Sequence, residues 1–118
     1  MRRIEIYKGN KKIFDGKSSE SLFFKLKGLM FKKKIRNNEC IMFEFNKDEE
    51  IIIHMLFVFF SIDAIWLDKD FRILEIKRNI KPFTFLIKPR YRARYFIETS
   101  ANATNKLSVG DKLIVKFK

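Results

Sequence analysis

The sequence predicts a mainly β domain, an antiparallel β-sandwich or jelly-roll-like flattened barrel with one or two short helices. Three observations predict this class. Apolar and polar residues alternate over many short segments, turn residues separate these segments, and 118 residues make one ordinary domain, residues 1–118. An aromatic content of 15% supplies large side chains for a packed core.

The N-terminal part predicts two strands and a helix. Ile4 and Ile6 alternate with polar neighbours, which is typical of a half-buried strand, and a turn at 8–11 leads to a short returning strand. A run of Ser and Glu at 18–21 then has the composition of a helix start. Gly28 stands where the helix would end, so we expect one short helix over about 19–27.

The central segment 51–63, IIIHMLFVFFSID, is the most apolar part of the chain. It is too short for a membrane-spanning helix, which needs about 20 residues. Its Ile, Val and Phe content favours extended backbone, and apolar side chains occupy both alternating positions. We therefore predict a strand that is buried on both faces, and no membrane span.

The remaining chain continues the β pattern, with turns or prolines between its segments. The hairpin 64–67 and 71–77, joined by the tight turn 68–70, is the clearest pairing. Further strands are predicted at 41–45, 83–87, 95–98 and 113–117, and one helical turn within 100–106.

The net charge of +12 and the pI near 10 would attract phosphates and anionic headgroups. The alternative is a general bias in surface composition, such as that of an AT-rich genome or a thermophile, and we favour this explanation of the charge. Cys40 is the only cysteine, so no intramolecular disulfide is expected and the chain is interpreted as cytoplasmic. No secretory signal follows Met1.

An ordered set of short motifs accompanies these elements. They are Gly28-Leu29-Met30-Phe31, Met42-Phe43-Glu44-Phe45, His54-Met55, Ile62-Asp63, Leu67-Asp68, Pro82, Tyr95-Phe96-Ile97-Glu98 and Gly110-Asp111. In this order and at these intervals, the chain resembles the widespread uncharacterised family catalogued as domain of unknown function 192, over about residues 18–115.

The resemblance implies a compact, mostly antiparallel β-sandwich with one or two short helices, and no established reaction. It also implies structural roles for the motif residues Gly28, Leu29, Met30, Ile62, Pro82, Gly110 and Asp111. The family's usual proline before the Ile-Asp pair is replaced here by Ser61.

One candidate pocket is formed by ionisable residues within apolar segments. These are His54, with its neighbour Met55, and the carboxylates Asp63 and Glu98. A buried carboxylate needs hydrogen-bond partners, and such a group can either grip a ligand or exchange protons with it. The alternative, which we favour, is a structural carboxylate that accepts backbone N–H groups at a corner between a strand and a turn.

A second candidate is a polyanion-binding surface. Arg90, Arg92 and Arg94 alternate with Tyr91 and Tyr95, so in a strand the three arginines would share one face. Arginine pairs with phosphate and tyrosine stacks on bases. A second cluster consists of Lys32, Lys33, Lys34 and Arg36. The alternative is a solvated edge strand, whose charges discourage aggregation.

No metal site and no cofactor are predicted, because one His and one Cys without close spacing cannot supply a zinc site, and no glycine-rich phosphate loop exists. The favoured function is a non-enzymatic module that binds a small ligand or a partner. The alternatives are an accessory protein that binds RNA or single-stranded DNA, and an enzyme with a pocket around His54, Asp63 and Glu98. The sequence identifies neither the partner nor the oligomeric state.

Overall fold

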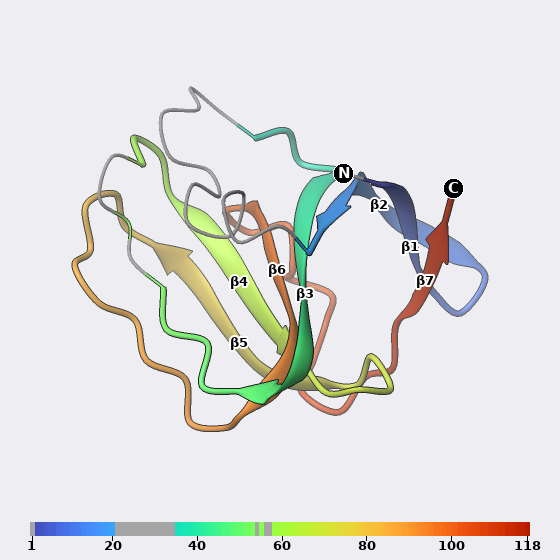
Figure 1. The fold of residues 1–118 in the computed structure, drawn as a ribbon. Coiled ribbons are helices and arrows are strands. Elements are labelled where there is room, and N and C mark those ends of the chain that lie inside the picture. Colours follow the sequence, from blue (N-terminus) through green and yellow to red (C-terminus); the bar gives the residue numbers. More distant parts are fainter. Residues whose placement is uncertain (1, 21–34, 54, 56–57) are drawn as a thin grey trace.

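The alternating segments form seven β-strands in the structure, a computed structural model that describes residues 2–20, 35–53, 55 and 58–118 (Figure 1). The strands are β1 (Arg2–Lys8), β2 (Lys11–Ser19), β3 (Glu39–Glu49), β4 (Ile62–Leu67), β5 (Ile73–Ile80), β6 (Ala93–Ser100) and β7 (Ile114–Phe117). They form one sheet in the order β5-β4-β6-β3-β2-β1-β7. The predicted mainly β class is confirmed.

The sheet is mixed, so the predicted antiparallel arrangement holds for every neighbouring pair of strands except β2 and β3. β2 and β3 pair in parallel, with Gly16 opposite Cys40 and Ser19 opposite Phe43, whereas the other neighbours are antiparallel. Parallel neighbours cannot be joined by a tight hairpin, and the long connection 20–38 meets this requirement. The helix predicted over 19–27 lies outside the described residues except at Ser19, which ends β2, and Glu20.

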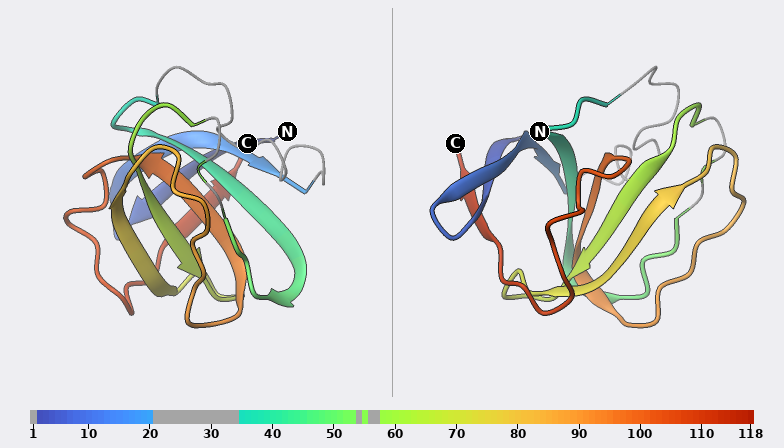
Figure 2. Two further views of the ribbon diagram at one scale, coloured as in Figure 1. Left: turned by 90° about the vertical axis from the view of Figure 1, so that its left-hand side faces the viewer. Right: turned by 180° about the vertical axis from the view of Figure 1, so that it is seen from behind.

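The sheet curls around one of its faces, as the views in Figure 2 show. All seven strands contribute side chains to a single cluster on this face, which we call the seven-strand core. A flat sheet could not bring its outermost strands into one cluster. Its buried members are Ile4, Ile6, Phe14, Cys40, Met42, Ile65, Leu67, Ile73, Ile97, Leu107 and Leu113.

The other face of β3, β6, β4 and β5 carries a second cluster, which we call the loop-covered core. Ile41, Phe43, Trp66 and Phe96 supply its large strand side chains, and the loops before β4 and before β6 cover it. Because residues alternate between faces, each central strand serves both cores, which explains why β4 is buried at all six positions.

The predicted strand over 51–61 is wrong for the described part of that segment. Only Ile53 makes a bridge, to Ile87, and β4 begins at Ile62. Ile51, Met55 and Val58 are buried in the loop-covered core while other apolar residues of the segment face outward. A loop that lies across a sheet buries side chains without hydrogen-bonding to a neighbouring strand. Apolar residues at both sets of alternating positions therefore did not indicate a strand.

The remaining elements follow the sequence pattern closely. The hairpin β4–β5, the strand β6 and the strand β7 are confirmed, although β6 begins at Ala93 and β7 at Ile114. The strand predicted at 83–87 is a loop with one bridge at Ile87. Residues 101–106 form consecutive turns and no helix.

No helix among the described residues has the length and apolarity needed to cross a membrane.

Candidate functional site

Asp63 is fully buried, and it holds the end of β5 and the turns that follow β6. Its Oδ1 accepts the backbone N–H of Asn79 at 2.8 Å, and its Oδ2 accepts the N–H and the hydroxyl of Thr104 at 3.2 and 2.6 Å. Both carboxylate oxygens thus have hydrogen-bond donors, which agrees with the structural role that the sequence favoured. A buried carboxylate is tolerated in a protein interior when it is hydrogen-bonded in this way.

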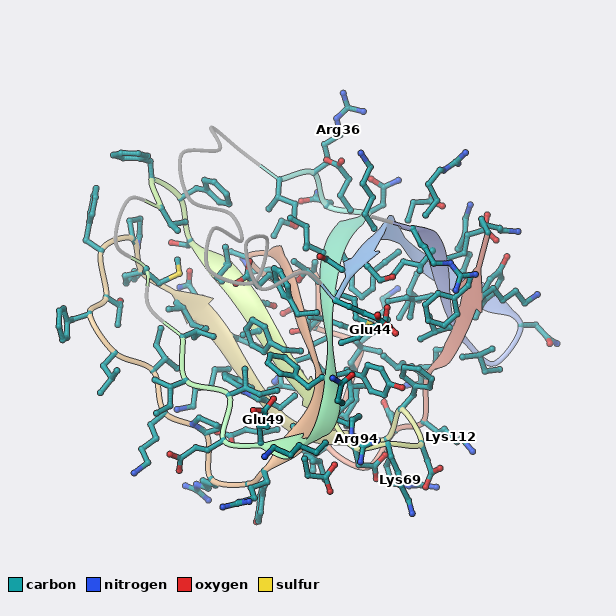
Figure 3. The ribbon with its side chains drawn as sticks, in the orientation of Figure 1. Arg36, Glu44, Glu49, Lys69, Arg94 and Lys112 are labelled. Atoms are coloured by element: carbon teal, nitrogen blue, oxygen red, sulfur yellow. The ribbon has the colours of Figure 1, made fainter. Side chains whose placement is uncertain are left out.

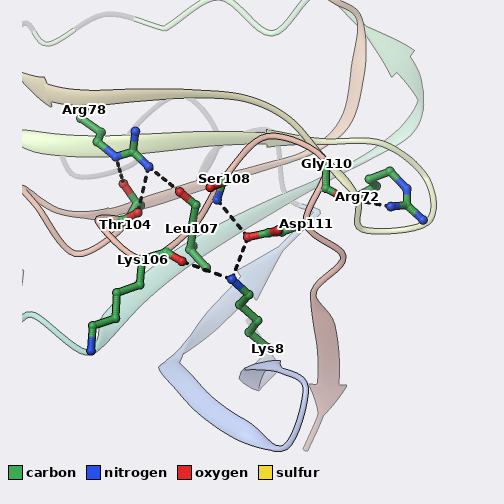
Figure 4. Close-up of polar contacts among 9 residues, drawn as sticks. All are labelled: Lys8, Arg72, Arg78, Thr104, Lys106, Leu107, Ser108, Gly110 and Asp111. Atoms are coloured by element: carbon green, nitrogen blue, oxygen red, sulfur yellow. Dashed lines mark hydrogen bonds and ion pairs between the residues drawn. The ribbon is translucent and has the colours of Figure 1, made fainter.

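Thr104 connects this buried carboxylate to a surface guanidinium. The hydroxyl that donates to Asp63 also accepts Nε–H of Arg78 at 3.1 Å. Nη2 of Arg78 donates to the backbone carbonyls of Thr104 and Leu107, at 3.0 and 2.6 Å (Figure 4). The Arg78 guanidinium is therefore fixed along one edge, and its Nη1 lies on the side away from these bonds.

Arg78 lines an open groove of about 530 Å³. Its other lining residues come from β5 and from the turn before β7: Ile76, Asn105, Leu107, Ser108 and Val109. The lining thus combines hydrogen-bonding side chains, from Arg78, Asn105 and Ser108, with apolar ones. The volume lies within the range of about 300–1,000 Å³ for small-molecule sites, although the groove is more open and more polar than most of them.

The turn 108–111 fixes the wall of the groove. Oδ2 of Asp111 accepts the N–H of Ser108 at 2.9 Å and forms an ion pair with Nζ of Lys8 at 3.0 Å (Figure 4). The hydrogen bond from Lys8, together with that from Ser108, lowers the pKa of Asp111. Gly110 adopts a left-handed φ of 95°, and its N–H donates to the carbonyl of Ile73.

The structure does not bring Asp63 and Glu98 together, so the predicted pocket around His54, Asp63 and Glu98 is not formed as proposed. Asp63 lies opposite Thr99 and Glu98 lies opposite Ala64 in the β4–β6 pairing. Since neighbouring residues of a strand point to opposite faces, the two carboxylates lie on opposite faces of the sheet. Met55 is buried in the loop-covered core, and His54 lies outside the described residues.

The arginine–tyrosine stretch that was predicted to form one strand face lies in a strand only at its end. Arg94 is on β6, whereas Arg90, Tyr91 and Arg92 belong to the preceding loop, so the three arginines do not share a strand face. Nε of Arg94 pairs with Asp48 at 3.1 Å.

Arg36 and Arg94 lie near opposite ends of β3, and Figure 3 shows them far apart. Lys32, Lys33 and Lys34 lie outside the described residues, as do the motif residues Gly28, Leu29 and Met30. Among the other motif residues, Ile62 is fully buried at the start of β4 and Pro82 lies in the turn after β5.

Sequence reasoning missed Arg78, Thr104 and the other residues of the groove. The available signal was the requirement of a buried Asp63 for donors, which indicates that partners exist but not which residues they are. Thr104 is 41 positions from Asp63 and reaches it only because the turns after β6 fold back over the start of β4. In the described part of the chain, no three His, Cys, Asp or Glu side chains are grouped closely enough to hold a metal ion.

Taken together, a single curled mixed sheet with a polar groove beside its β5 edge defines a small β-domain with a ligand-sized surface site. The model of the DUF192 family, described as "Uncharacterized ACR, COG1430", matches residues 6–115, and the chain belongs to this family. The resemblance found in the sequence is thereby confirmed.

Related sequences come from thermophilic archaea. The chain is 30% identical over 114 residues to a UPF0127 protein of Thermococcus sibiricus, covering 92% of this chain and 71% of the relative. It is 34% identical over 99 residues to the UPF0127 protein PH1112 of Pyrococcus horikoshii, covering 80% and 82%.

Two solved structures share the fold. A protein of unknown function from Novosphingobium aromaticivorans superposes with a TM-score of 0.84 at 18% identity, covering 95% of this chain and 83% of that chain. A putative transcription regulator from Sinorhizobium meliloti superposes with a TM-score of 0.82 at 17% identity, covering 98% and 92%. At these identities the likeness concerns the fold alone.

Proposed function

We propose that this domain is a non-enzymatic module that binds a small organic anion, a carboxylate or a phosphate, in the groove beside Arg78. The observation that carries the proposal is the fixed guanidinium. Arg78 is held by three hydrogen bonds to Thr104 and Leu107, and Thr104 is in turn held by the buried Asp63.

Pre-organisation is what makes this arginine a good anion receptor. A free arginine side chain loses rotamer entropy when it binds, whereas Arg78 is already ordered. Its Nη1 retains N–H donors that are not used by the described residues, and hydrogen bonds between a guanidinium and an anion are among the stronger ones. The net charge of +12 adds a long-range attraction for anions.

The other groove residues fit a ligand with a small apolar body. Asn105 and Ser108 offer an amide and a hydroxyl, while Ile76, Leu107 and Val109 offer apolar surface. The nearest buried acid, Asp63, accepts three hydrogen bonds and is fully buried, so it is not placed to exchange protons with a ligand. This favours binding over acid–base catalysis.

The proposal is tested by NMR titration of the protein labelled with nitrogen-15, with inorganic phosphate and with hexanoate as probes. We expect saturable shifts of the Arg78 Nε–H signal and of the Asn105 and Ser108 amides. Arg78→Gln should weaken binding about tenfold to a hundredfold, since a hydrogen bond to a charged group contributes about 1.5–3 kcal/mol.

Arg3→Gln is the matched control. Arg3 is an exposed arginine of β1, and it does not line the groove. This variant should bind both probes like the parent protein. Absence of saturable shifts, or equal weakening by both variants, would contradict the proposal.

Two backbone hydrogen bonds beside the groove support classification of the fold as a flattened, incompletely closed barrel. The N–H of Ile73 donates to the carbonyl of Asp111, and the N–H of Leu113 donates to the carbonyl of Phe71. These bonds join the chain before β7 to the start of β5, which are the two edges of the sheet. The wall of the groove is thus part of the barrel closure.

A further inference from the structure

The chain between β5 and β6, residues 81–92, forms a strap on one side of the sheet (Figure 1). Lys77 faces this side, because its Nζ donates to the carbonyl of Lys88 at 3.0 Å. Arg78 is its neighbour in β5 and therefore points to the other face. The strap is a separate surface, and an inference about it does not depend on the proposed anion groove.

Backbone hydrogen bonds hold the strap in place. Ile53 and Ile87 exchange N–H···O bonds of 3.1 and 2.8 Å, and the N–H of Met55 donates to the carbonyl of Thr84 at 2.7 Å. The N–H of Phe83 donates to the carbonyl of Met55 at 2.9 Å. The side chains that the strap exposes are therefore carried on an anchored backbone.

The exposed side chains are unusually large and apolar. Phe85 is 73% exposed, Phe83 55% and Tyr91 56%, and Phe59 from the neighbouring loop is 57% exposed. Phe59 and Phe83 contact each other edge to face, with ring centroids 5.3 Å apart. Scattered exposed apolar residues need no explanation, but several on adjoining loops mark a contact surface.

The strap is also strongly basic. Residues 77–97 contain no Asp or Glu and seven cations, which are Lys77, Arg78, Lys81, Lys88, Arg90, Arg92 and Arg94. Of these, Lys81, Lys88, Arg90 and Arg92 are exposed members of the strap. The one ion pair that an exposed strap cation makes with a described residue joins Lys88 to Glu50 at 3.8 Å, and exposed pairs of this kind are weak.

We propose that this strap binds single-stranded nucleic acid. Exposed cations and rings are interspersed along it, in the order Lys81, Phe83, Phe85, Lys88, Arg90, Tyr91 and Arg92. Single-stranded nucleic acid presents phosphates and bases in a repeating line, and such binding combines a basic track with aromatic rings on which bases stack. The positive strap and the polyanion are complementary in charge.

The test measures fluorescence anisotropy of labelled 15-mers of oligo(U) and oligo(dT) at several salt concentrations. We expect binding that weakens steeply with salt. The double variant F85A/Y91A preserves the charge, and because stacking contributes about 1–3 kcal/mol per base it should weaken binding at least tenfold. Arg90→Gln with Arg92→Gln should lower the salt slope by about 1.4, which is about 0.7 per lost phosphate contact.

Two controls distinguish an effect of the strap residues from an effect of the overall charge or of exposed apolar surface in general. Ile114→Ala removes an exposed apolar side chain of β7, and Lys11→Gln with Lys112→Gln removes two exposed cations that lie outside the strap. Both controls should bind the oligonucleotides within twofold of the parent protein. Because Phe85 and Tyr91 are exposed, thermal melting should show that F85A/Y91A folds like the parent.

Three results would overturn the proposal. They are no binding at low salt, the same loss in the control variants as in the strap variants, and binding to phosphatidylglycerol vesicles that requires Phe85 while oligonucleotides do not bind. The last result would assign the strap to an anionic lipid surface. None of them bears on phosphate or hexanoate binding beside Arg78, so the two proposals fail independently.

Discussion

The hydroxyl of Thr104 lies 2.6 Å from Oδ2 of Asp63, although the two residues are 41 positions apart in the chain. Through this contact the start of β4 holds the turns that follow β6, and the same hydroxyl accepts Nε–H of Arg78. One side chain thus connects a buried carboxylate to the groove in which we propose that an anion binds.

Thr104→Val should therefore reduce both stability and anion binding. The change keeps the shape but leaves Asp63 and Arg78 each without one partner, and a buried unsatisfied group costs about 1–3 kcal/mol. We expect that loss in the free energy of unfolding measured with urea, and weaker binding of phosphate. Thr104→Ser, which keeps the hydroxyl, should restore most of both. Thr99→Val is the control, because the buried Thr99 hydroxyl bonds only to the adjacent Ser100 carbonyl.

Gly16→Ala should destabilise the parallel pairing of β2 and β3. Gly16 lies directly opposite Cys40, and an added Cβ would collide with the Cys40 carbonyl oxygen and come 2.6 Å from its sulfur. Overpacking of this kind costs about 1–3 kcal/mol or more. Urea unfolding measures the effect, and Lys17→Ala, at an exposed neighbouring position, should have little effect. Unchanged stability of Gly16→Ala would show that the strands can separate without cost.

Cys40 should be unreactive in the folded protein. Burial, with a smaller effect from the charges of Asp15 and Glu39, raises its pKa to about 12. Only the thiolate reacts with disulfide reagents, so labelling by Ellman's reagent at pH 8 should proceed only as the protein unfolds. Rapid labelling in native buffer would contradict the burial of this thiol.

The same shift predicts a loss of stability in alkali. The thiol pKa is about 8.5 in an unfolded chain, and the folded value is higher, so the stabilising contribution is complete below about pH 8.5. It is lost progressively as the pH rises toward 12, because the unfolded state gives up its proton first. Urea unfolding from pH 8 to 11 should show this decline, and Cys40→Ala should show a shallower one.

Trp66→Phe should loosen the loop that covers the second core. Nε1–H of the fully buried Trp66 donates to the carbonyl of Ile51 at 3.0 Å, which ties the loop before β4 to the sheet. Loss of this bond and of part of the ring volume should cost about 2–4 kcal/mol, measured by circular dichroism during urea unfolding. Hydrogen exchange of the Ile53 and Ile87 amides should accelerate. If exchange there is unchanged, the loop is held by its other contacts.

The sequence predicted the strands best where one face meets a core and the other meets polar surroundings. In β7, for example, Val115 and Phe117 pack against the seven-strand core while Ile114 and Lys116 are exposed, as the alternation indicated. It predicted least well where apolar residues cover a core from a loop. Residues 51–61 and 83–87 have strand-like composition, but in the described part of these segments only Ile53 and Ile87 form a bridge, with each other.

The candidate site divides in the same way. A largely apolar run that ends in Asp63 indicated a buried carboxylate with structural partners, and that interpretation agrees with three donors around it. The sequence also grouped Asp63 with Glu98, and the strand register separates them onto opposite faces. A register cannot be deduced from one strand alone, because a shift of one residue reverses every side chain.

The amino-acid sequence by itself determined the mainly β class, the family, the hairpin β4–β5 and the need of Asp63 for hydrogen-bond donors. These follow from local alternation, turn chemistry and the cost of burying charge, which depend on near neighbours in the chain. Only the tertiary structure decided that β2 and β3 run parallel, that Thr104 joins Asp63 to Arg78, and that the strap and the groove lie on opposite sides. Those relationships join residues tens of positions apart, and the curling of a single sheet around one core brings them into contact.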